Sequence, residues 1–121
     1  MKTTIITILI LLASAVILSA CTAQNTSMQY DAVAKCMTAN GVVMYGTGWC
    51  THCQAQKHMF GNSFQYIHFV DCDANTQTCK DVGVQGYPTW AINGSLYPGE
   101  QSMYLLAGTS GCMDALLNST G

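Results

Sequence analysis

The sequence contains no arginine and only four lysines among its 121 residues. Charged residues make up 8% of the chain, and the formal net charge is −2. A protein that binds nucleic acid needs basic residues to neutralise the phosphate backbone. The scarcity of basic residues therefore excludes nucleic acid as a partner.

The chain also lacks an unbroken apolar run of the roughly 18 residues that a membrane-spanning helix needs. Its main apolar segment, residues 5–18, follows the basic Lys2 and ends in Leu18-Ser19-Ala20-Cys21. A basic start, a short apolar run and small residues before a cleavage point are typical of an export signal. The last four residues resemble a lipobox, in which Cys21 is lipidated and becomes the new N-terminus.

We therefore predict that residues 1–21 are a signal peptide with a lipobox-like end. An ordinary signal peptide cut near Ala20, or a short uncleaved anchor, is the alternative. Residues 22–27 are polar and would form a short tether above the membrane. Residues 28–121 suffice for one domain with one core. This organisation predicts an exported, membrane-tethered domain on the extracytoplasmic side.

Seven cysteines in so short an exported chain are typical of an oxidising compartment. Without Cys21 six remain, an even number that allows every cysteine to be paired. They are Cys36, Cys50, Cys53, Cys72, Cys79 and Cys112.

The segment Trp49-Cys50-Thr51-His52-Cys53 is the most informative part of the chain. It opens a predicted helix, and the free N–H groups and dipole at a helix N-terminus favour a thiolate. A protonated His52 would add positive charge nearby; a surface helix residue is the alternative for this histidine. We predict that Cys50 is the exposed nucleophile and Cys53 its buried partner. Thiol–disulfide exchange needs no organic cofactor.

Zinc sites use the same Cys-x-x-Cys spacing and are the rival for this pair. His58, or Cys72 with Cys79, would supply the remaining ligands. The six residues between Cys72 and Cys79 do not repeat the spacing of a zinc knuckle, and an exported protein favours disulfides. We therefore predict no metal.

Apolar periodicity and turn residues predict the order α-β-α-β-α-β-β-α. The predicted helices cover residues 28–39, 50–60, 74–82 and 101–107, and the predicted strands cover residues 42–45, 64–70, 88–92 and 95–97. This order predicts an α/β fold in which a mixed sheet of about four strands ends in a hairpin and carries helices on both faces.

The order of elements, with a cysteine pair after the first strand, resembles the thioredoxin fold. The resemblance covers roughly residues 28–112 and also rests on Gly86-Tyr87-Pro88-Thr89. It implies that Pro88 is cis and lies against the cysteine pair, and that Tyr87 pairs with substrate through its backbone. A trans Pro88 at a strand edge is the alternative. Together with Trp49 and Thr51, these residues would bind substrate; core packing is the alternative for Trp49 and Tyr87.

A closer resemblance is to the thioredoxin-like domains fused to, or working beside, bacterial and archaeal homologues of vitamin K epoxide reductase. The matching residues are Met44-Tyr45-Gly46, Trp49-Cys50, His52-Cys53, Gln56-Lys57, Phe60-Gly61, Cys72, Cys79 and Gly86-Tyr87-Pro88-Thr89-Trp90. This resemblance implies client proteins as electron donors and a quinone-linked membrane protein as electron acceptor.

The chain departs from the thioredoxin pattern at the usual proton acceptor of the second cysteine. Many members carry an acidic residue six positions before the first active cysteine, where this chain has Met44. A lysine near the following strand is also missing, with His68 and Phe69 in that region. We expect the acceptor to be absent or replaced. Thr51 stands where proline or glycine is common, which leaves the redox potential open.

The remaining cysteines suggest two structural disulfides. A bond between Cys72 and Cys79 would pin the turn that leads into a short helix, with two free thiols as the alternative. Cys36 and Cys112 would form the other bond. We expect their helices on opposite faces of the sheet, so this bond requires the C-terminal tail to curl under the sheet.

Together these features predict an extracytoplasmic thiol–disulfide oxidoreductase that favours disulfide formation in client proteins. A disulfide reductase or isomerase of the same fold is the nearest alternative. A non-catalytic module that binds a metal or a partner through the same loop is the other.

Overall fold

The computed structural model describes residues 29–120. The predicted signal peptide, the tether and the lipidation site at Cys21 lie outside these residues. The elements are α2 (Asp31–Ala39), β1 (Val43–Gly46), α3 (Thr51–Phe60), the 3-10 helix η2 (Gly61–Tyr66), β2 (His68–Asp71), α4 (Thr76–Val82), β3 (Thr89–Ile92), β4 (Ser95–Pro98), α5 (Met103–Thr109) and α6 (Met113–Ser119).

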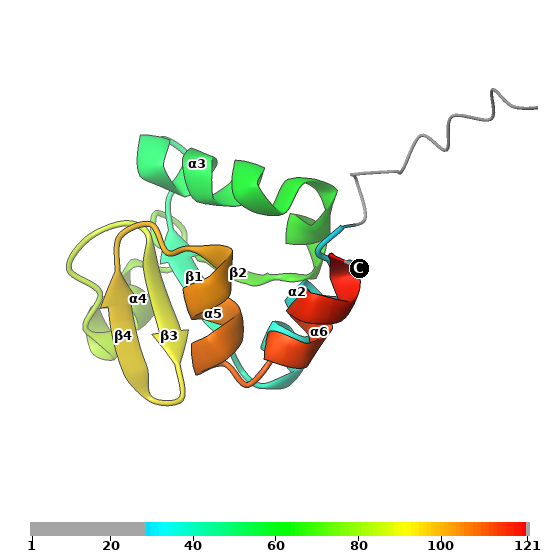
Figure 1. The fold of residues 1–121 in the computed structure, drawn as a ribbon. Coiled ribbons are helices and arrows are strands. Elements are labelled where there is room, and N and C mark those ends of the chain that lie inside the picture. The colour runs from blue at the N-terminus through cyan, green and yellow to red at the C-terminus, as the bar shows by residue number, and fades with distance from the viewer. Residues whose placement is uncertain (1–28, 121) are drawn as a thin grey trace, which may run out of the picture.

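The strands form one mixed sheet in the order β2-β1-β3-β4 (Figure 1). β1 runs parallel to β2 and antiparallel to β3, and Val43 lies opposite His68 on one side and Ala91 on the other. Asn93 and Gly94 both have positive φ, as a tight turn between β3 and β4 requires. The predicted mixed sheet with a closing hairpin is confirmed.

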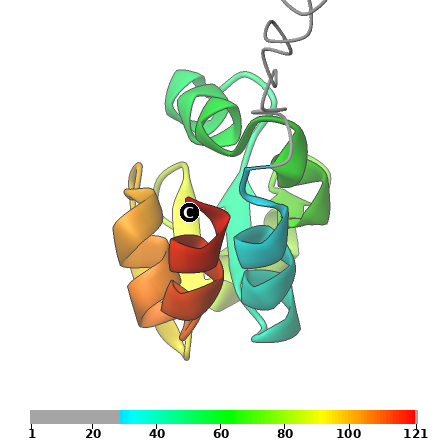
Figure 2. The ribbon, with the colours of Figure 1, turned by 45° about the vertical axis from the view of Figure 1, so that its right-hand side comes forward.

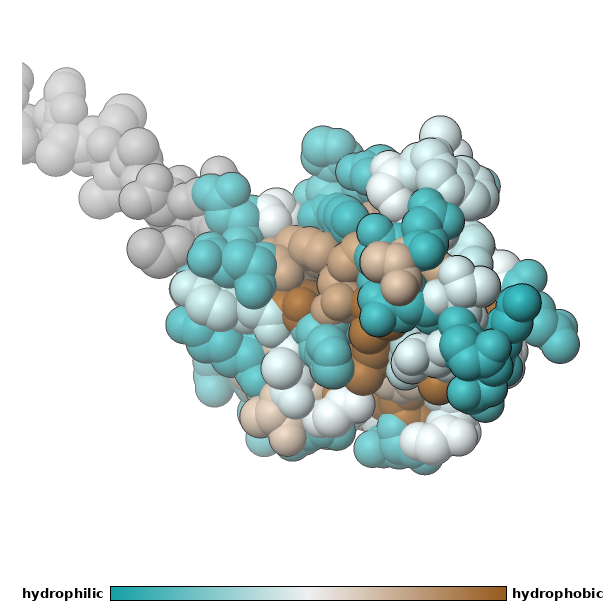
Figure 3. Space-filling view, turned by 180° about the vertical axis from the view of Figure 1, so that it is seen from behind, coloured by the Kyte–Doolittle hydropathy of each residue, from teal (hydrophilic) through white to brown (hydrophobic). Residues whose placement is uncertain are grey.

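Consecutive residues of β1 point to opposite faces of the sheet and belong to different clusters. Met44 packs in the main core, to which α2, α3, α5 and α6 contribute, together with Trp90 and Ile92 of β3. Tyr45 packs in a smaller cluster with Cys79 of α4. Helices therefore lie on both faces, as predicted. Figure 3 shows the molecule from behind, where apolar side chains reach the surface between polar ones.

Six of the eight predicted elements differ from the observed ones by one to three residues at an end, as in α2, which begins at Asp31 and not at residue 28. Two predictions depart further from the structure. The strand predicted at residues 64–70 is confined to β2, because residues 61–66 form η2 and Ile67 N–H bonds to the Phe64 carbonyl. The ring of Phe64 packs edge-on against Phe60 and Phe69, so this turn half-buries the aromatic residues that resembled a strand.

The C-terminus contains two helices, where the sequence predicted one final helix at residues 101–107. α5 runs from Met103 to Thr109, Gly111 reverses the chain at φ +75°, and α6 follows. A positive φ is a conformation that glycine adopts without strain. Leu116 of α6 is buried in the main core, which stabilises this added helix.

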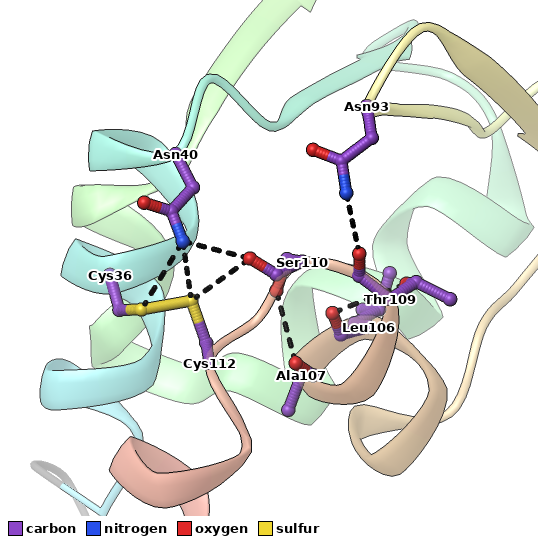
Figure 4. The surroundings of a disulfide bond; sticks show 8 residues. All are labelled: Cys36, Asn40, Asn93, Leu106, Ala107, Thr109, Ser110 and Cys112. Carbon is purple, nitrogen blue, oxygen red and sulfur yellow. Dashed lines mark hydrogen bonds between the residues drawn. A yellow bond between two sulfur atoms is a disulfide. The ribbon is translucent and has the colours of Figure 1, made fainter.

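The placement of the Cys36–Cys112 disulfide corrects the prediction that its helices lie on opposite faces. α2 and α6 lie side by side on the same face, as Figures 1 and 2 show. Cys112 immediately precedes α6, and its Cα lies 5.9 Å from that of Cys36. The Asn40 side chain donates a hydrogen bond to the Ser110 carbonyl at 2.8 Å beside this disulfide (Figure 4). No tail has to curl under the sheet, because the turn before α6 already returns the chain to α2.

Candidate active site

The cysteine pair lies at the N-terminus of α3, directly after the turn that follows β1. Cys50 is the N-cap, and its sulfur accepts a hydrogen bond from the backbone N–H of Cys53 at 3.1 Å. Cys50 is 6% exposed and Cys53 is fully buried. The predicted order of accessibility therefore holds, but Cys50 is largely covered rather than exposed. Its position favours negative charge on the sulfur.

Cys53 lies in a tight, apolar environment. Burial raises the pKa of Cys53 to about 11, and the hydrogen bond with Cys50 adds to this rise. The backbone of Thr47 and the charge of Lys57 act in the opposite direction and lower the pKa of Cys53. A Cβ atom on Gly46 would lie only 2.8 Å from the Cys53 sulfur, so the end of β1 leaves just enough space for this thiol.

A groove runs past Cys50. The Tyr87–Pro88 peptide bond is cis, and Pro88 is fully buried. The rings of Trp49 and Tyr87 meet edge to face, with centroids 6.1 Å apart. The groove is lined by Trp49, Cys50, Thr51, His52 and Tyr87. The structure thus brings five of the sequence-predicted site residues together in one groove, and Pro88 follows the lining residue Tyr87 in the chain.

The loop after β2 fixes the rim of the groove. The indole N–H of Trp49 donates a hydrogen bond to the carboxylate of Asp73 at 2.9 Å. Cys72, next to Asp73, forms a disulfide with Cys79. These two cysteines are bonded to each other and do not offer thiolates to zinc. Among residues 29–120, no group of three or more histidine, cysteine or acidic side chains is arranged to hold a metal ion.

His52 has a partner that the sequence did not indicate. Its Nδ1 atom lies 2.6 Å from a carboxylate oxygen of Glu100, in the loop between β4 and α5. The His52 side chain is 72% exposed. The carboxylate offsets the positive charge of a protonated His52, which weakens the influence of that charge on Cys50.

A buried glutamine holds this loop beside α3. The side-chain oxygen of Gln56 accepts hydrogen bonds from the Trp90 indole N–H at 3.1 Å and from the Gln101 backbone N–H at 2.7 Å. Its amide nitrogen donates to the Gln101 carbonyl at 3.0 Å. Because Gln101 follows Glu100, this network sets the position of the carboxylate that contacts His52.

Sequence reasoning missed four residues of the site: Gln56, Lys57, Asp73 and Glu100. Gln56 and Lys57 follow Cys53 by three and four residues, so helical spacing was a signal that both lie on its side of α3. Asp73 and Glu100 approach from other loops, and no local pattern indicates their partners.

Comparison with known proteins identifies the fold family. Residues 21–102 match the family model described as Thioredoxin. The chain belongs to the thioredoxin family. One relative, "Thiol-disulfide oxidoreductase LTO1" of Arabidopsis thaliana, is 35% identical over 89 residues, which cover 66% of this chain and 24% of that protein. Another, "Protein disulfide-isomerase" of Aspergillus niger, is 31% identical over 90 residues, which cover 66% of this chain and 18% of that protein.

The chain spans about a quarter or less of the length of these curated relatives. The thioredoxin fold predicted from the sequence is confirmed, and the names of the relatives support a thiol–disulfide oxidoreductase. Within residues 29–120 we find no helix with the length and apolar character needed to cross a membrane.

Proposed function

We propose that this protein exchanges disulfides with client proteins through Cys50 and Cys53, outside the cytoplasm. The observation that carries the proposal is the Cys50 sulfur at the N-cap of α3, which accepts a hydrogen bond from the Cys53 N–H and lines the groove with Trp49 and Tyr87. A sulfur held in this way is suited to be the attacking thiolate in one direction and the attacked sulfur in the other.

In the oxidising direction, a client thiolate attacks Cys50 of the Cys50–Cys53 disulfide and releases Cys53 as a thiolate. A second client thiolate then attacks the client sulfur of the mixed disulfide and releases Cys50. The client gains a disulfide, and the protein is left as a dithiol. Trp49 and Tyr87 flank Cys50 in the groove and provide apolar surface for the client chain.

We favour client oxidation as the net direction, followed by reoxidation through a quinone-linked membrane protein similar to vitamin K epoxide reductase. The resemblance of the cysteine motif and its flanking residues to domains that partner such enzymes supports this partner. An export signal that ends at a lipidated Cys21 would hold the domain close to a membrane enzyme. Replacement of Cys21 by serine is expected to release the protein from membranes, and retained membrane association would contradict the lipid anchor.

The decisive test is the reactivity of the full-length protein toward a reduced dithiol peptide. The oxidised protein should convert the peptide to its disulfide, and Cys50→Ser should abolish this activity while the fold is retained. Reduced protein should be reoxidised by membranes that contain the quinone-linked enzyme. If Cys50 reacts with alkylating reagents like an ordinary cysteine and forms no mixed disulfide, the proposal is wrong.

Isomerase or reductase activity is the second candidate, and the contact between His52 and Glu100 favours it. Reduction potentials of dithiol proteins range from about −270 mV for thioredoxin to about −120 mV for a strong bacterial oxidase. A carboxylate that offsets the His52 charge moves the site toward the reducing end. Equilibration with glutathione measures the potential and separates the two directions.

A further inference from the structure

Lys57 lies close to the cysteine pair, and the exchange steps described above give it no role. Its ammonium nitrogen lies 4.0 Å from the ring centroid of Phe69 and 5.4 Å from that of Phe64. The side chain is half-buried. Within residues 29–120, no carboxylate lies within ion-pair distance of it. The cation is thus held on aromatic rings and not neutralised by an acidic partner.

The ring beneath Lys57 borders the Cys53 thiol. A Cβ atom on Gly46 would lie 3.2 Å from Cε2 of Phe69 and 2.8 Å from the Cys53 sulfur, so the ring and the sulfur share one small space. Lys57 also follows Cys53 by four residues on α3, which places both side chains on the same face of the helix. The ammonium group therefore lies over a ring of β2 that borders the Cys53 thiol, on a side chain of the same helix as Cys53.

We propose that Lys57 is a positioning residue that stabilises the thiolate of Cys53 during disulfide exchange. This proposal rests on the proposed function, in which Cys53 is the buried cysteine of the reacting pair, and it assigns the positive charge that stabilises the Cys53 thiolate. Met44 occupies the strand position at which the sequence lacks the acidic residue of many thioredoxin-fold proteins, and it is fully buried and apolar. Lys57 supplies electrostatic stabilisation from the helix instead.

Cys53 needs this help because its thiol is hard to ionise. Burial and the neighbouring Cys50 raise the pKa of Cys53, whereas Lys57 and the Thr47 backbone lower it. In a mixed disulfide on Cys50, the Cys53 thiol first gives its proton to solvent. The Cys53 thiolate then attacks the Cys50 sulfur, forms the Cys50–Cys53 bond and expels the other sulfur as a thiolate, which takes up a proton. In the reverse direction Cys53 is the leaving group, and the same charge stabilises it.

The test uses the full-length protein with Cys50 and Cys53 reduced, mixed rapidly with glutathione disulfide. Acid quenching and mass spectrometry separate the dithiol, the glutathione adduct on Cys50 and the closed disulfide. Lys57→Met should leave the first step unchanged and slow the second step by about threefold to tenfold at neutral pH, because less Cys53 is present as thiolate when the cation that lowers its pKa is removed. The adduct should therefore accumulate.

Further variants separate the effect of the Lys57 charge from the effect of its side-chain packing. Lys57→Arg keeps the cation over the rings and should restore the second step. Lys35→Met is the matched control, because Lys35 of α2 also lies over an aromatic ring, 4.2 Å from the centroid of Tyr66, but is not among the groups that shift the pKa of Cys53. Its second step should stay at the wild-type rate. Lys57→Gln serves as the neutral variant if methionine destabilises the fold.

An unchanged second step in both neutral variants overturns the proposal, as does equal slowing of both steps or a failure of Lys57→Arg to restore the rate. If wild-type protein forms no glutathione adduct at all, the proposed function is wrong and this inference falls with it. A normal first step with no effect of Lys57 contradicts the inference alone.

Discussion

Gly46 ends β1 at the point where the Cys53 sulfur fills the space that a side chain would occupy. A Cβ atom there would lie 2.8 Å from this sulfur and 3.2 Å from the Phe69 ring. Gly46→Ala should therefore displace Cys53, lower the free energy of unfolding by about 1–3 kcal/mol and slow closure of the Cys50–Cys53 bond. Chemical denaturation and the glutathione reaction measure the two effects.

Gly48 provides the control for this prediction. It lies two residues further along the same turn, and a Cβ atom there would have no neighbour within 4 Å. Gly48→Ala should change stability and closure much less than Gly46→Ala. Similar losses in both variants would show that the turn as a whole, and not the space beside Cys53, is sensitive.

The raised pKa of Cys53 makes the stability of the reduced protein depend on pH. The folded thiol has a pKa of about 11, whereas the thiol in the unfolded chain ionises at its ordinary, lower value. As pH rises between these values, the unfolded state loses the proton first, so stability falls. The reduced protein should lose roughly 2–3 kcal/mol relative to the oxidised protein between about pH 9 and pH 11. A constant difference between the two denaturation curves would contradict this prediction.

Substitution of His52 tests whether charge close to the cysteine pair controls its reduction potential. The residue lies between the two cysteines in the first turn of α3, where proline is tolerated because the N–H groups of that turn have no helical partners. His52→Pro removes the side chain that carries positive charge when it is protonated, and should lower the potential by tens of millivolts. Glu100→Gln should shift the potential in the opposite direction, because it removes the charge that opposes His52. An unchanged glutathione equilibrium in both variants would exclude this control.

At the scale of elements, α3 is joined to the loop before α5 by Gln56. Gln56→Leu would leave the buried indole N–H of Trp90 and the backbone groups of Gln101 without partners. The expected loss in the free energy of unfolding is about 1–3 kcal/mol, together with a changed contact between His52 and Glu100. Thermal denaturation measures the loss. Gln54→Leu is the control on the same helix, because Gln54 is exposed and should cost less than about 1 kcal/mol.

Local signals account for the elements that the sequence predicted well. Cys50 at the start of α3 and Gly61 at its end bound the helix as expected, and Asn93-Gly94 marks the hairpin. The errors arise where tertiary contacts decide between conformations. The aromatic residues before β2 fit a strand pattern but lie in η2, where they are half-buried, and α6 is held in place by contacts with α2.

The candidate site likewise contains residues that sequence patterns predict and residues that only tertiary contacts bring together. Spacing along the chain indicated the cysteine pair, and the resemblance to the thioredoxin fold indicated Pro88 through Gly86-Tyr87-Pro88-Thr89. The partners of Trp49 and His52 lie 24 and 48 residues away in the sequence, so only the folded chain brings them together. The position of Lys57 was predictable only in part. Its helical spacing from Cys53 can be counted in the sequence, but the aromatic rings beneath its ammonium group come together only in the folded chain.

At the scale of the whole molecule, the two structural disulfides constrain very different lengths of chain. Cys36 and Cys112 are 76 residues apart, and Cys72 and Cys79 are 7 apart. Chain entropy therefore predicts that the double variant Cys36→Ser/Cys112→Ser loses about 4 kcal/mol of stability, and Cys72→Ser/Cys79→Ser about 2.5 kcal/mol. Denaturation under oxidising conditions should reveal this order. The reverse order would indicate that the loop around Asp73 contributes more than its length suggests.

The burial of the structural disulfides also determines which of their sulfurs can react with the thiols of a second copy of the protein. Cys72, Cys79 and Cys112 are each at most 3% exposed, whereas Cys36 is half-buried. Both sulfurs of the Cys72–Cys79 disulfide are therefore shielded from the thiols of a second copy of the protein. The Cys36–Cys112 disulfide is shielded at Cys112 alone, so Cys36 is the structural sulfur that such a thiol would reach first.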